Sequence, residues 1–399
     1  MTSNQASAGE LLQLIRGGRA HTRADLQRVT GLSRSTVGHR LDLLNRAGWL
    51  RHTTGTSTGG RPCDRIEFDP GHASVIAVDL ETRHARAAVL DLAGTVLAEH
   101  TGDLDITQGP DQVLERVAGW LPGLIEAAGI TPAGVCGIGL SVPGPVDWEV
   151  GRVVQPPIMP GWDQYPIRER FQEVYAEHVG ESGEAGPIPV FLDNDANLMA
   201  LAEQQAHHRD CDSFVLIKVS TGIGAGVVIG GDVYRGIDGG AGDIGHIRLH
   251  DHPDALCMCG SYGCLAAVAS GRALARALSE QGLPTTSGSD VRHLLAAGNP
   301  EAIRLAQQAG RVVGAVLATV VTFLNPGVLM IAGDLAGTPF TTGVREVLYR
   351  RAMPRTTANL SIVSPHLGDR AGLVGAGAMV VGLLYSPEHA DDRLSRLTP

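Results

Sequence analysis

Residues 242–264 read GDIGHIRLHDHPDALCMCGSYGC, and this stretch carries one histidine and three cysteines with the spacing His-x10-Cys-x-Cys-x4-Cys. One imidazole and three thiolates are the ligand set that tetrahedral zinc binds in structural sites. Four protein ligands leave no open position for a catalytic water, so the predicted ion is structural. The predicted ligands are His246, Cys257, Cys259 and Cys264.

The alternative interpretation of this stretch is a loop with scattered cysteines and no metal. Clustered cysteines with a histidine in an intracellular protein are typical of a metal site, and Gly260 and Gly263 allow the loop to turn around an ion. The run Gly242–His246 leads directly into the cluster. Bound zinc would therefore hold Asp243 and the exposed edge of His246 in place.

Length and composition favour an intracellular protein of several domains. A chain of 399 residues is long enough for two or three domains. It has no apolar run of about 18 residues and no basic N-terminus followed by an apolar stretch, so neither a membrane span nor a signal peptide is expected. Six mostly clustered cysteines do not resemble a secreted disulfide framework. We therefore expect a cytoplasmic protein without a membrane partner.

The N-terminal residues predict a helix-turn-helix. A first helix over residues 8–17 is followed by a second helix capped by Thr22, a turn at residues 30–32 and a third helix capped by Ser33. The apolar stripe of the third helix leaves an outward face that suits contacts to phosphates and base edges in a major groove. The residues predicted to bind DNA from this region are Ser33, Arg34, Ser35, Thr36, His39 and Arg40.

A hairpin is expected directly after the third helix. Trp49 to Arg51 and the polar run Thr53 to Thr58 are typical of a winged hairpin, and GGRP follows at residues 59–62. An arginine between glycines and a proline, Arg61, could enter a minor groove, where the negative potential favours a guanidinium. The alternative is a three-helix protein-interaction domain with an arginine-rich solvated face.

The charge distribution also favours nucleic acid as a partner. Residues 1–65 carry ten arginines and four acidic residues, a net charge of +6, which leaves −16 for the rest of a chain whose total is −10. A small basic module on a larger acidic body is typical of a DNA-binding head attached to a sensor. Beyond Ile66, short apolar runs alternate with amphipathic helices, which predicts an α/β sheet protein.

Two stretches resemble the ROK family, which contains bacterial sugar kinases and sugar-responsive repressors of the NagC/XylR type. GDIGH followed by CMCGSYGC is similar to the family signature, and GLSRSTVGHRLDLLNRAGWL followed by GGRP is similar to the DNA-binding head of its repressors. ROK kinases lack such a head. The resemblance covers almost the whole chain and implies a two-lobed, actin-like ATPase fold with a cleft between the lobes.

The resemblance also implies the domain organisation. Residues 1–65 would form the winged helix-turn-helix, and residues 70–195 the first α/β lobe, completed by residues 371–385. The second α/β lobe, with the zinc site, would span residues 196–370. Residues 386–399 are expected to form a mobile polar tail.

On the sugar side of the implied cleft, Asn194 and Asp195 match a family asparagine that binds a sugar hydroxyl and a family aspartate that is the kinase base. The alternative for this pair is a helix N-cap. Asp243 matches a family glutamate that holds sugar hydroxyls, and His246 matches a zinc-bound histidine whose second nitrogen faces the sugar. Ala266 stands where the family has a further sugar-binding glutamate.

On the nucleotide side, two elements depart from the kinase pattern. The turn Asp79-Leu80-Glu81-Thr82 has Glu81 where the family has a phosphate-facing glycine, which opposes ATP by both size and charge. Asp334 stands where the family prefers glycine. The second phosphate loop survives as Ser220–Gly226, and its predicted vestigial phosphate-binding residues are Thr221, Gly222 and Gly224.

These features together predict a transcription regulator, most often a repressor, of carbohydrate metabolism. Its expected partners are a pseudo-palindromic operator in double-stranded DNA and a sugar or sugar-derived effector, bound by a homo-oligomer, a dimer or tetramer. Its expected cofactor is structural Zn²⁺, and no catalytic residue is expected. Two alternatives stay open: an active ATP-dependent hexose kinase that carries a DNA-binding head, and an orphan regulator with a vestigial sugar site.

Overall fold

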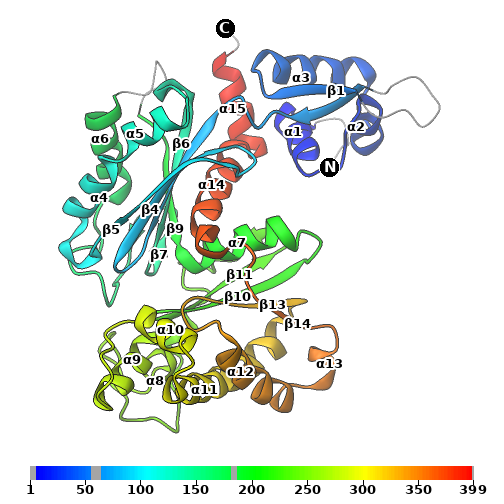
Figure 1. The fold of residues 1–399 in the computed structure, drawn as a ribbon. Helices are drawn as coiled ribbons and strands as arrows, with labels where there is room; N and C mark the ends of the chain where they lie inside the picture. The colour runs from blue at the N-terminus through cyan, green and yellow to red at the C-terminus, as the bar shows by residue number, and fades with distance from the viewer. Residues whose placement is uncertain (1–5, 55–63, 181–186, 398–399) are drawn as a thin grey trace.

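The computed structural model describes residues 6–54, 64–180 and 187–397, which form a small N-terminal head and two α/β lobes (Figure 1). In the head, Ser7, Thr22 and Ser33 each cap a helix by accepting a hydrogen bond from the backbone three residues on. Gly31, in the left-handed conformation at φ 70°, ends the second helix and begins the turn to the third. The head contains α1 (Ala8–Arg16), α2 (Arg23–Thr30), α3 (Arg34–Arg46), β1 (Leu50–Thr54) and β2 (Asp64–Phe68).

The head has the element order that the sequence predicts. Three helices are followed by β1 and β2, which pair in antiparallel register from Leu50 opposite Phe68 onward. Because β2 continues to Phe68, the head extends past the predicted boundary at residue 65. The predicted minor-groove residue Arg61 lies outside the described residues.

The first lobe is built on a five-stranded sheet of order β5-β4-β3-β6-β9. β3, β4 and β5 form an antiparallel meander, and β6 and β9 run parallel to β3. Apolar residues of α4, α5 and α6 share one core with this sheet. The elements are β3 (Ser74–Leu80), β4 (His84–Asp91), β5 (Val96–Asp103), α4 (Pro110–Ala118), α5 (Leu121–Ala127), β6 (Val135–Val142), the short hairpin β7 (Val146–Asp147) and β8 (Arg152–Val153), α6 (Ile167–Val179) and β9 (Val190–Asn194).

The second lobe repeats this plan with a sheet of order β12-β11-β10-β13-β14, in which β13 and β14 run parallel to β10. Helices α8, α9, α11 and α12 pack on one face of the sheet. The elements are β10 (Ser213–Val219), β11 (Ile223–Ile229), β12 (Asp232–Val233), α8 (Leu265–Ala269), α9 (Gly271–Glu280), α10 (Gly288–Ala296), α11 (Pro300–Leu324), β13 (Val328–Ala332), α12 (Thr338–Arg351), α13 (Pro354–Thr357) and β14 (Ser361–Val363).

Two helices, α7 (Asp195–His207) and α14 (Ala371–Leu384), lie between the sheets of the two lobes (Figure 1). α7 packs on β11 and on α14, and α14 packs on β3 and β6. The contact is close enough to require glycine: a Cβ atom at Gly375 would lie 2.0 Å from the carbonyl oxygen of Leu198, and one at Gly226 would lie 2.2 Å from that of Ala196. The helix pair therefore joins the lobes along one side.

The C-terminal residues form a helix, so the predicted mobile polar tail at residues 386–399 is wrong. α15 (Pro387–Leu397) packs against α1 and buries Ala390 and Leu394, which lie one turn apart. The side chain of Asp391 accepts a hydrogen bond of 2.8 Å from the backbone N–H of Gly9. The many charged residues of this segment made it resemble a solvated tail, although two apolar residues in it have helical spacing.

Tyr385 connects the head to the lobes. Its ring is fully buried, with centroids 5.2 Å from Trp49 and 5.1 Å from Phe68, both of the head. The hydroxyl lies 2.6 Å from Nε2 of His72, and the guanidinium of Arg393 lies 4.6 Å from the ring centroid. Because Tyr385 directly follows α14, the head is anchored to the helix that holds the two lobes together.

One helix of the described residues, α11, is long and apolar enough to cross a membrane by length and composition alone. Residues 368–384 and 387–396 pass the same test only as a pair, across a bend of 63°. The buried residues of α11 belong to the core of the second lobe, and those of α14 and α15 to the core shared with the head. We therefore interpret these helices as core helices.

Candidate functional site: an interlobe pocket, a cysteine cluster and a helical face

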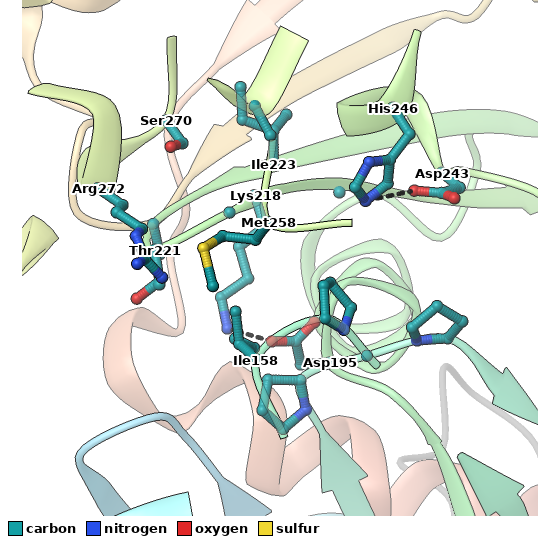
Figure 2. A pocket seen from close by; sticks show the side chains of 18 of the residues that line it. Ile158, Asp195, Lys218, Thr221, Ile223, Asp243, His246, Met258, Ser270 and Arg272 are labelled. Atoms are coloured by element: carbon teal, nitrogen blue, oxygen red, sulfur yellow. Dashed lines mark hydrogen bonds and ion pairs between the residues drawn. The ribbon is translucent and has the colours of Figure 1, made fainter. Parts of the chain in front are cut away.

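A pocket of about 420 Å³ opens between the two lobes. Its walls come from the β3–β4 turn and the β9–α7 junction of the first lobe, and from the β10–β11 turn, the Gly239–His246 segment and α9 of the second. Figure 2 shows Asp195 and Lys218 pointing toward each other, with Asp243 and His246 along another wall. The pocket brings together the sugar-side residues, the phosphate loop and one wall of the cysteine cluster that the sequence predicts.

Asn194 ends β9 and caps α7 at the edge of this pocket. Its Oδ1 accepts a hydrogen bond of 2.9 Å from the N–H of Ala196, and its Nδ2 donates one of 2.9 Å to the carbonyl oxygen of Gly144. The cap interpretation of this residue is thus correct, and its side chain still lines the pocket. A ligand would find Asn194 already fixed in orientation.

Asp193 and Arg235 support this junction, and the sequence alone did not single them out. Asp193 is 1 % exposed and accepts hydrogen bonds from Nε of Arg235 at 2.8 Å and from Nδ2 of Asn197 at 3.0 Å. The guanidinium of Arg235 also lies 4.8 Å from the ring centroid of Trp148. The sequence indicates this arrangement only through the two aspartates on either side of Asn194. It does not indicate Arg235, which belongs to the second lobe.

Asp195 forms an ion pair with Lys218, the only lysine in the sequence. The distance from Nζ to Oδ2 is 2.7 Å, and the two side chains are 15 % and 12 % exposed. Burial opposes the ammonium charge, but the carboxylates of Asp195, Glu81 and Asp79 raise the pKa of Lys218 above its ordinary value. The lysine therefore stays charged and neutralises the residue that matches the kinase base.

Replacement of Lys218 by methionine is expected to lower the free energy of unfolding by about 3–5 kcal/mol near neutral pH, because Asp195 would be left buried without a cation. Adding Asp195→Asn to the variant should recover most of the stability. An equal loss in the single and the double variant would contradict the pairing.

Two carboxylates, Glu81 and Asp334, line the pocket together with the cations Lys218, Arg272 and Arg276. Burial opposes the charge of Glu81, but a hydrogen bond from His84 and the Lys218 ammonium lower the pKa of Glu81 to about 2, so it is a carboxylate at neutral pH. Burial, together with the neighbouring Glu81, raises the pKa of Asp79 to about 6. Burial also raises the pKa of Asp334. Glu81 and Asp334, which line the pocket, are unfavourable neighbours for a triphosphate.

The two phosphate turns meet across the cleft. The hydroxyls of Thr82 in the β3–β4 turn and Thr221 in the β10–β11 turn lie 3.3 Å apart. Gly222 completes the tip of the β10–β11 turn, while Gly224 already pairs with Lys218 inside the β-ladder. Part of the glycine-rich segment therefore belongs to strand β11, and the rest forms an ordinary hairpin turn.

The four predicted zinc ligands come together at one wall of the pocket. One ring nitrogen of His246 and the sulfurs of the three cysteines all lie within 4.8 Å of one another. The sulfurs of Cys259 and Cys264 are 3.8 Å apart, and the sulfur of Cys257 is 3.7 Å from Nδ1 of His246. Two sulfurs bound at about 2.3 Å to one tetrahedral ion lie about 3.8 Å apart. The cluster could therefore hold a metal ion.

Because Nδ1 of His246 faces the cysteines, Nε2 faces the pocket. Nε2 lies 3.8 Å from Oδ1 of Asp243, a side chain that is half exposed. A Cβ atom at Gly245 would lie 3.5 Å from that of Ala266, so Ala266 closes the same wall without any polar group. An ion at the cysteines would thus fix the histidine edge that a sugar would meet.

The predicted DNA-contact residues lie along one face of α3. Arg34, Ser35 and His39 are exposed, and Thr36 and Arg40 are half-buried. The hydroxyl of Ser33 accepts a hydrogen bond of 3.2 Å from the N–H of Thr36. Ser33 therefore caps the helix, and its hydroxyl also lies within hydrogen-bond distance of the hydroxyls of Ser35 and Thr36, at 2.9 and 2.8 Å.

Comparison with known proteins gives consistent matches. The model of the ROK family matches residues 75–382. The xylose repressor of Caldicellulosiruptor bescii is 28 % identical over 401 residues, which cover 95 % of this chain and 96 % of the repressor. The glucokinase of Thermotoga maritima is 29 % identical and covers 77 % of this chain and 96 % of its own length.

A crystal structure described as a ROK family transcriptional regulator, a homologue of the E. coli MLC protein, superposes with a TM-score of 0.78 at 27 % identity. The match covers 97 % of this chain and 98 % of the regulator. The repressor and this regulator therefore extend over the head, whereas the kinase match leaves about a quarter of the chain uncovered. The expected family and fold are confirmed.

Proposed function

The chain belongs to the ROK family, and we propose that it is a sugar-responsive, DNA-binding repressor of carbohydrate genes that has no sugar kinase activity. The observation that carries this proposal is a helix-turn-helix head joined through Tyr385 to a complete two-lobed sugar-kinase fold. The relatives that cover both parts are named as repressors or transcription regulators. We place the protein in the cytoplasm, where its operator would be.

A sugar in the cleft would act on the head through packed elements. Asn194 and Asp195 begin α7, α7 packs on α14, and Tyr385 at the end of α14 packs on Trp49 and Phe68 of the head. A ligand regulates only if its affinity differs between the DNA-bound and free states. Closure of the lobes around a sugar would provide that difference, because it would tilt α7 relative to α14.

Phosphoryl transfer is disfavoured at both ends of the pocket. The ammonium of Lys218 lies 2.7 Å from the carboxylate of Asp195, so an attacking hydroxyl would have to compete with Lys218 for that carboxylate. Glu81 is held as an anion where phosphates would lie. The competing proposal, an active hexose kinase, is favoured by the presence of Asp195 and of the Thr221 turn in one pocket.

The effector would meet Asn194, Asp195, Asp243 and the free edge of His246. The missing carboxylate at Ala266 removes one charge-assisted hydrogen bond, a loss of about 1.5–3 kcal/mol for a plain hexose. Alternatively, the space at Ala266 accepts a bulkier or more anionic sugar. Because several relatives are named xylose repressors, D-xylose is the first effector to test, followed by D-glucose.

The proposal is tested by calorimetry of the full chain with pentoses, hexoses, amino sugars and sugar phosphates, followed by DNA-binding assays with each sugar that binds. We expect one class to bind and to weaken operator binding, and a coupled assay with ATP to give no turnover. Ala266→Glu should tighten a plain hexose about 10-fold or more and weaken an anionic sugar.

Three results would overturn parts of this proposal. Turnover with ATP would favour the kinase. No binding of any sugar at millimolar concentration by either protein would favour a regulator whose sugar site is vestigial. A sugar that binds without changing DNA affinity would remove the sensing role.

A further inference from the structure

We propose that Glu203, His207 and His366 form a second divalent-metal site, separate from the cysteine cluster, at the junction of the two lobes. The ligand atoms of these three side chains all lie within 4.8 Å of one another. Two imidazoles with one carboxylate suit zinc and neighbouring transition metals, and they leave a position for water. The site is unrelated to the effector pocket, whose lining includes none of the three residues.

The buried carboxylate is the main observation in favour of a metal. The side chain of Glu203 is fully buried, and its Oε1 accepts hydrogen bonds of 2.9 and 2.8 Å from the N–H groups of His366 and Leu367. Its Oε2 is also buried and has no hydrogen-bond partner among the described residues. This oxygen faces Nδ1 of His366 at 3.5 Å. A buried anionic oxygen without a donor is costly, and a cation would satisfy it.

The two histidines can reach an ion from the solvent side. Both are exposed, and their rings stack with centroids 4.5 Å apart and an interplanar angle of 29°. Donor atoms about 2.1 Å from one ion lie roughly 3–3.5 Å apart. Rotation of the two exposed rings that moves their nitrogens by about an ångström would bring the three ligand atoms to that separation. The two stacked imidazoles and the buried carboxylate present two nitrogen donors and one oxygen donor to the same point.

The position of this cluster gives it a mechanical role. The described chain passes between the lobes twice, through α7 from β9 to β10 and through residues 364–370 from β14 to α14. Glu203 and His207 belong to the first crossing and His366 to the second. A metal bound by all three would tie the two crossings together. It would therefore limit the change in lobe angle that the proposed sensor uses.

The test is calorimetric titration of the full-length protein with Zn²⁺ after the cysteine cluster has been filled. We expect one further equivalent to bind. His207→Ala and His366→Ala should each weaken it at least about 10-fold, whereas His293→Ala, an exposed histidine on α10, should leave it unchanged. Co²⁺ in this site should show no thiolate charge-transfer band. Hydrogen exchange of residues 364–370 should slow when the metal binds.

Both replaced histidines are on the surface, so the variants should fold, and circular dichroism would check this. Glu203→Gln, which keeps an oxygen for the two N–H groups, should also lose the second equivalent. The proposal fails if wild type binds no second equivalent below about millimolar Zn²⁺. It also fails if the His207→Ala/His366→Ala protein binds that equivalent with unchanged affinity.

Discussion

Cys257→Ala is expected to abolish zinc binding at the cysteine cluster, from about one equivalent per chain to almost none. The remaining imidazole and two thiolates would still attract an ion, but tetrahedral structural sites depend on all four ligands. Structural zinc contributes about 10–16 kcal/mol of apparent binding free energy in small zinc peptides, and that energy is coupled to local folding. Residues 247–264 contain no strand or α-helix and are held by two isolated β-bridges and by turn hydrogen bonds, so a bound metal would add to their order.

The consequence should reach the pocket. His246 is positioned by Nδ1 against Cys257, and Asp243 lies one turn earlier, so both would lose their orientation with the ion. Sugar affinity should therefore fall by at least the value of one charge-assisted hydrogen bond, about 1.5–3 kcal/mol. The two sheets do not depend on this loop, and the thermal transition of the lobes should survive at a lower temperature.

Metal content by mass spectrometry is the direct measurement. It is best made in the His207→Ala/His366→Ala background, so that any metal counted belongs to the cysteine cluster. Cys211→Ala, which removes a cysteine outside the cluster whose thiol donates to the Ser213 carbonyl, should keep full zinc. Stoichiometric zinc in Cys257→Ala would rule out the assigned ligands.

The cysteine cluster was predictable as a candidate metal site because its ligands are close in sequence. Four ligands within one short stretch need no knowledge of the fold, and the glycines that allow the turn lie between them. The caps of α1, α2 and α3 are local in the same sense, since each hydroxyl bonds to a backbone three residues away. The elements of the head therefore followed from the sequence to within a few residues.

Contacts between distant residues were not predictable in this way. Lys218 stands out in the sequence as the only lysine, but the sequence does not indicate its partner. Its partner Asp195 lies 23 residues earlier, and the pair forms only because β10 ends beside the start of α7. Arg235 reaches Asp193 by a similar route. Pairs of this kind depend on how the strands and helices are arranged in space, and they produce no repeating pattern in the sequence.

Other errors had signals that were available. The apolar spacing of residues 111–128 is that of a single amphipathic helix, but the segment is divided into α4 and α5, because Pro122 has no N–H for the carbonyl of residue 118. In the C-terminal segment, Ala390 and Leu394 have helical spacing that the surrounding charges conceal. The missing N–H of a proline decided the structure in the first case, and the spacing of two apolar residues decided it in the second. The overall composition of each segment was a poorer guide.

Arg34→Ala and Arg40→Ala are expected to produce the largest loss of DNA binding. Both side chains project from the N-terminal half of α3, the part of a recognition helix that meets base edges. Loss of one bidentate base contact costs about 1–3 kcal/mol, and a dimer on a pseudo-palindrome would lose it in both half-sites. Operator affinity should therefore fall by about two decades or more for the variant that contacts a base.

The type of contact is distinguishable. If the arginine binds phosphate, affinity should fall equally for all sequences, and the slope of binding against salt should decrease by about one per contact. If it binds a base, non-specific affinity should change little, and specificity should relax at one position of each half-site. Binding measured at several salt concentrations, on the selected operator and on random DNA, separates the two.

The matched control is Arg304→Ala, which removes the same charge from α11 in the second lobe, where Arg304 pairs with Glu301. It should leave operator affinity and salt dependence unchanged, because an exposed pair far from the head contributes little beyond its own helix. Wild-type operator affinity in both Arg34→Ala and Arg40→Ala would remove α3 as the reading element. The arginine-rich head would then be better explained as a protein-interaction surface.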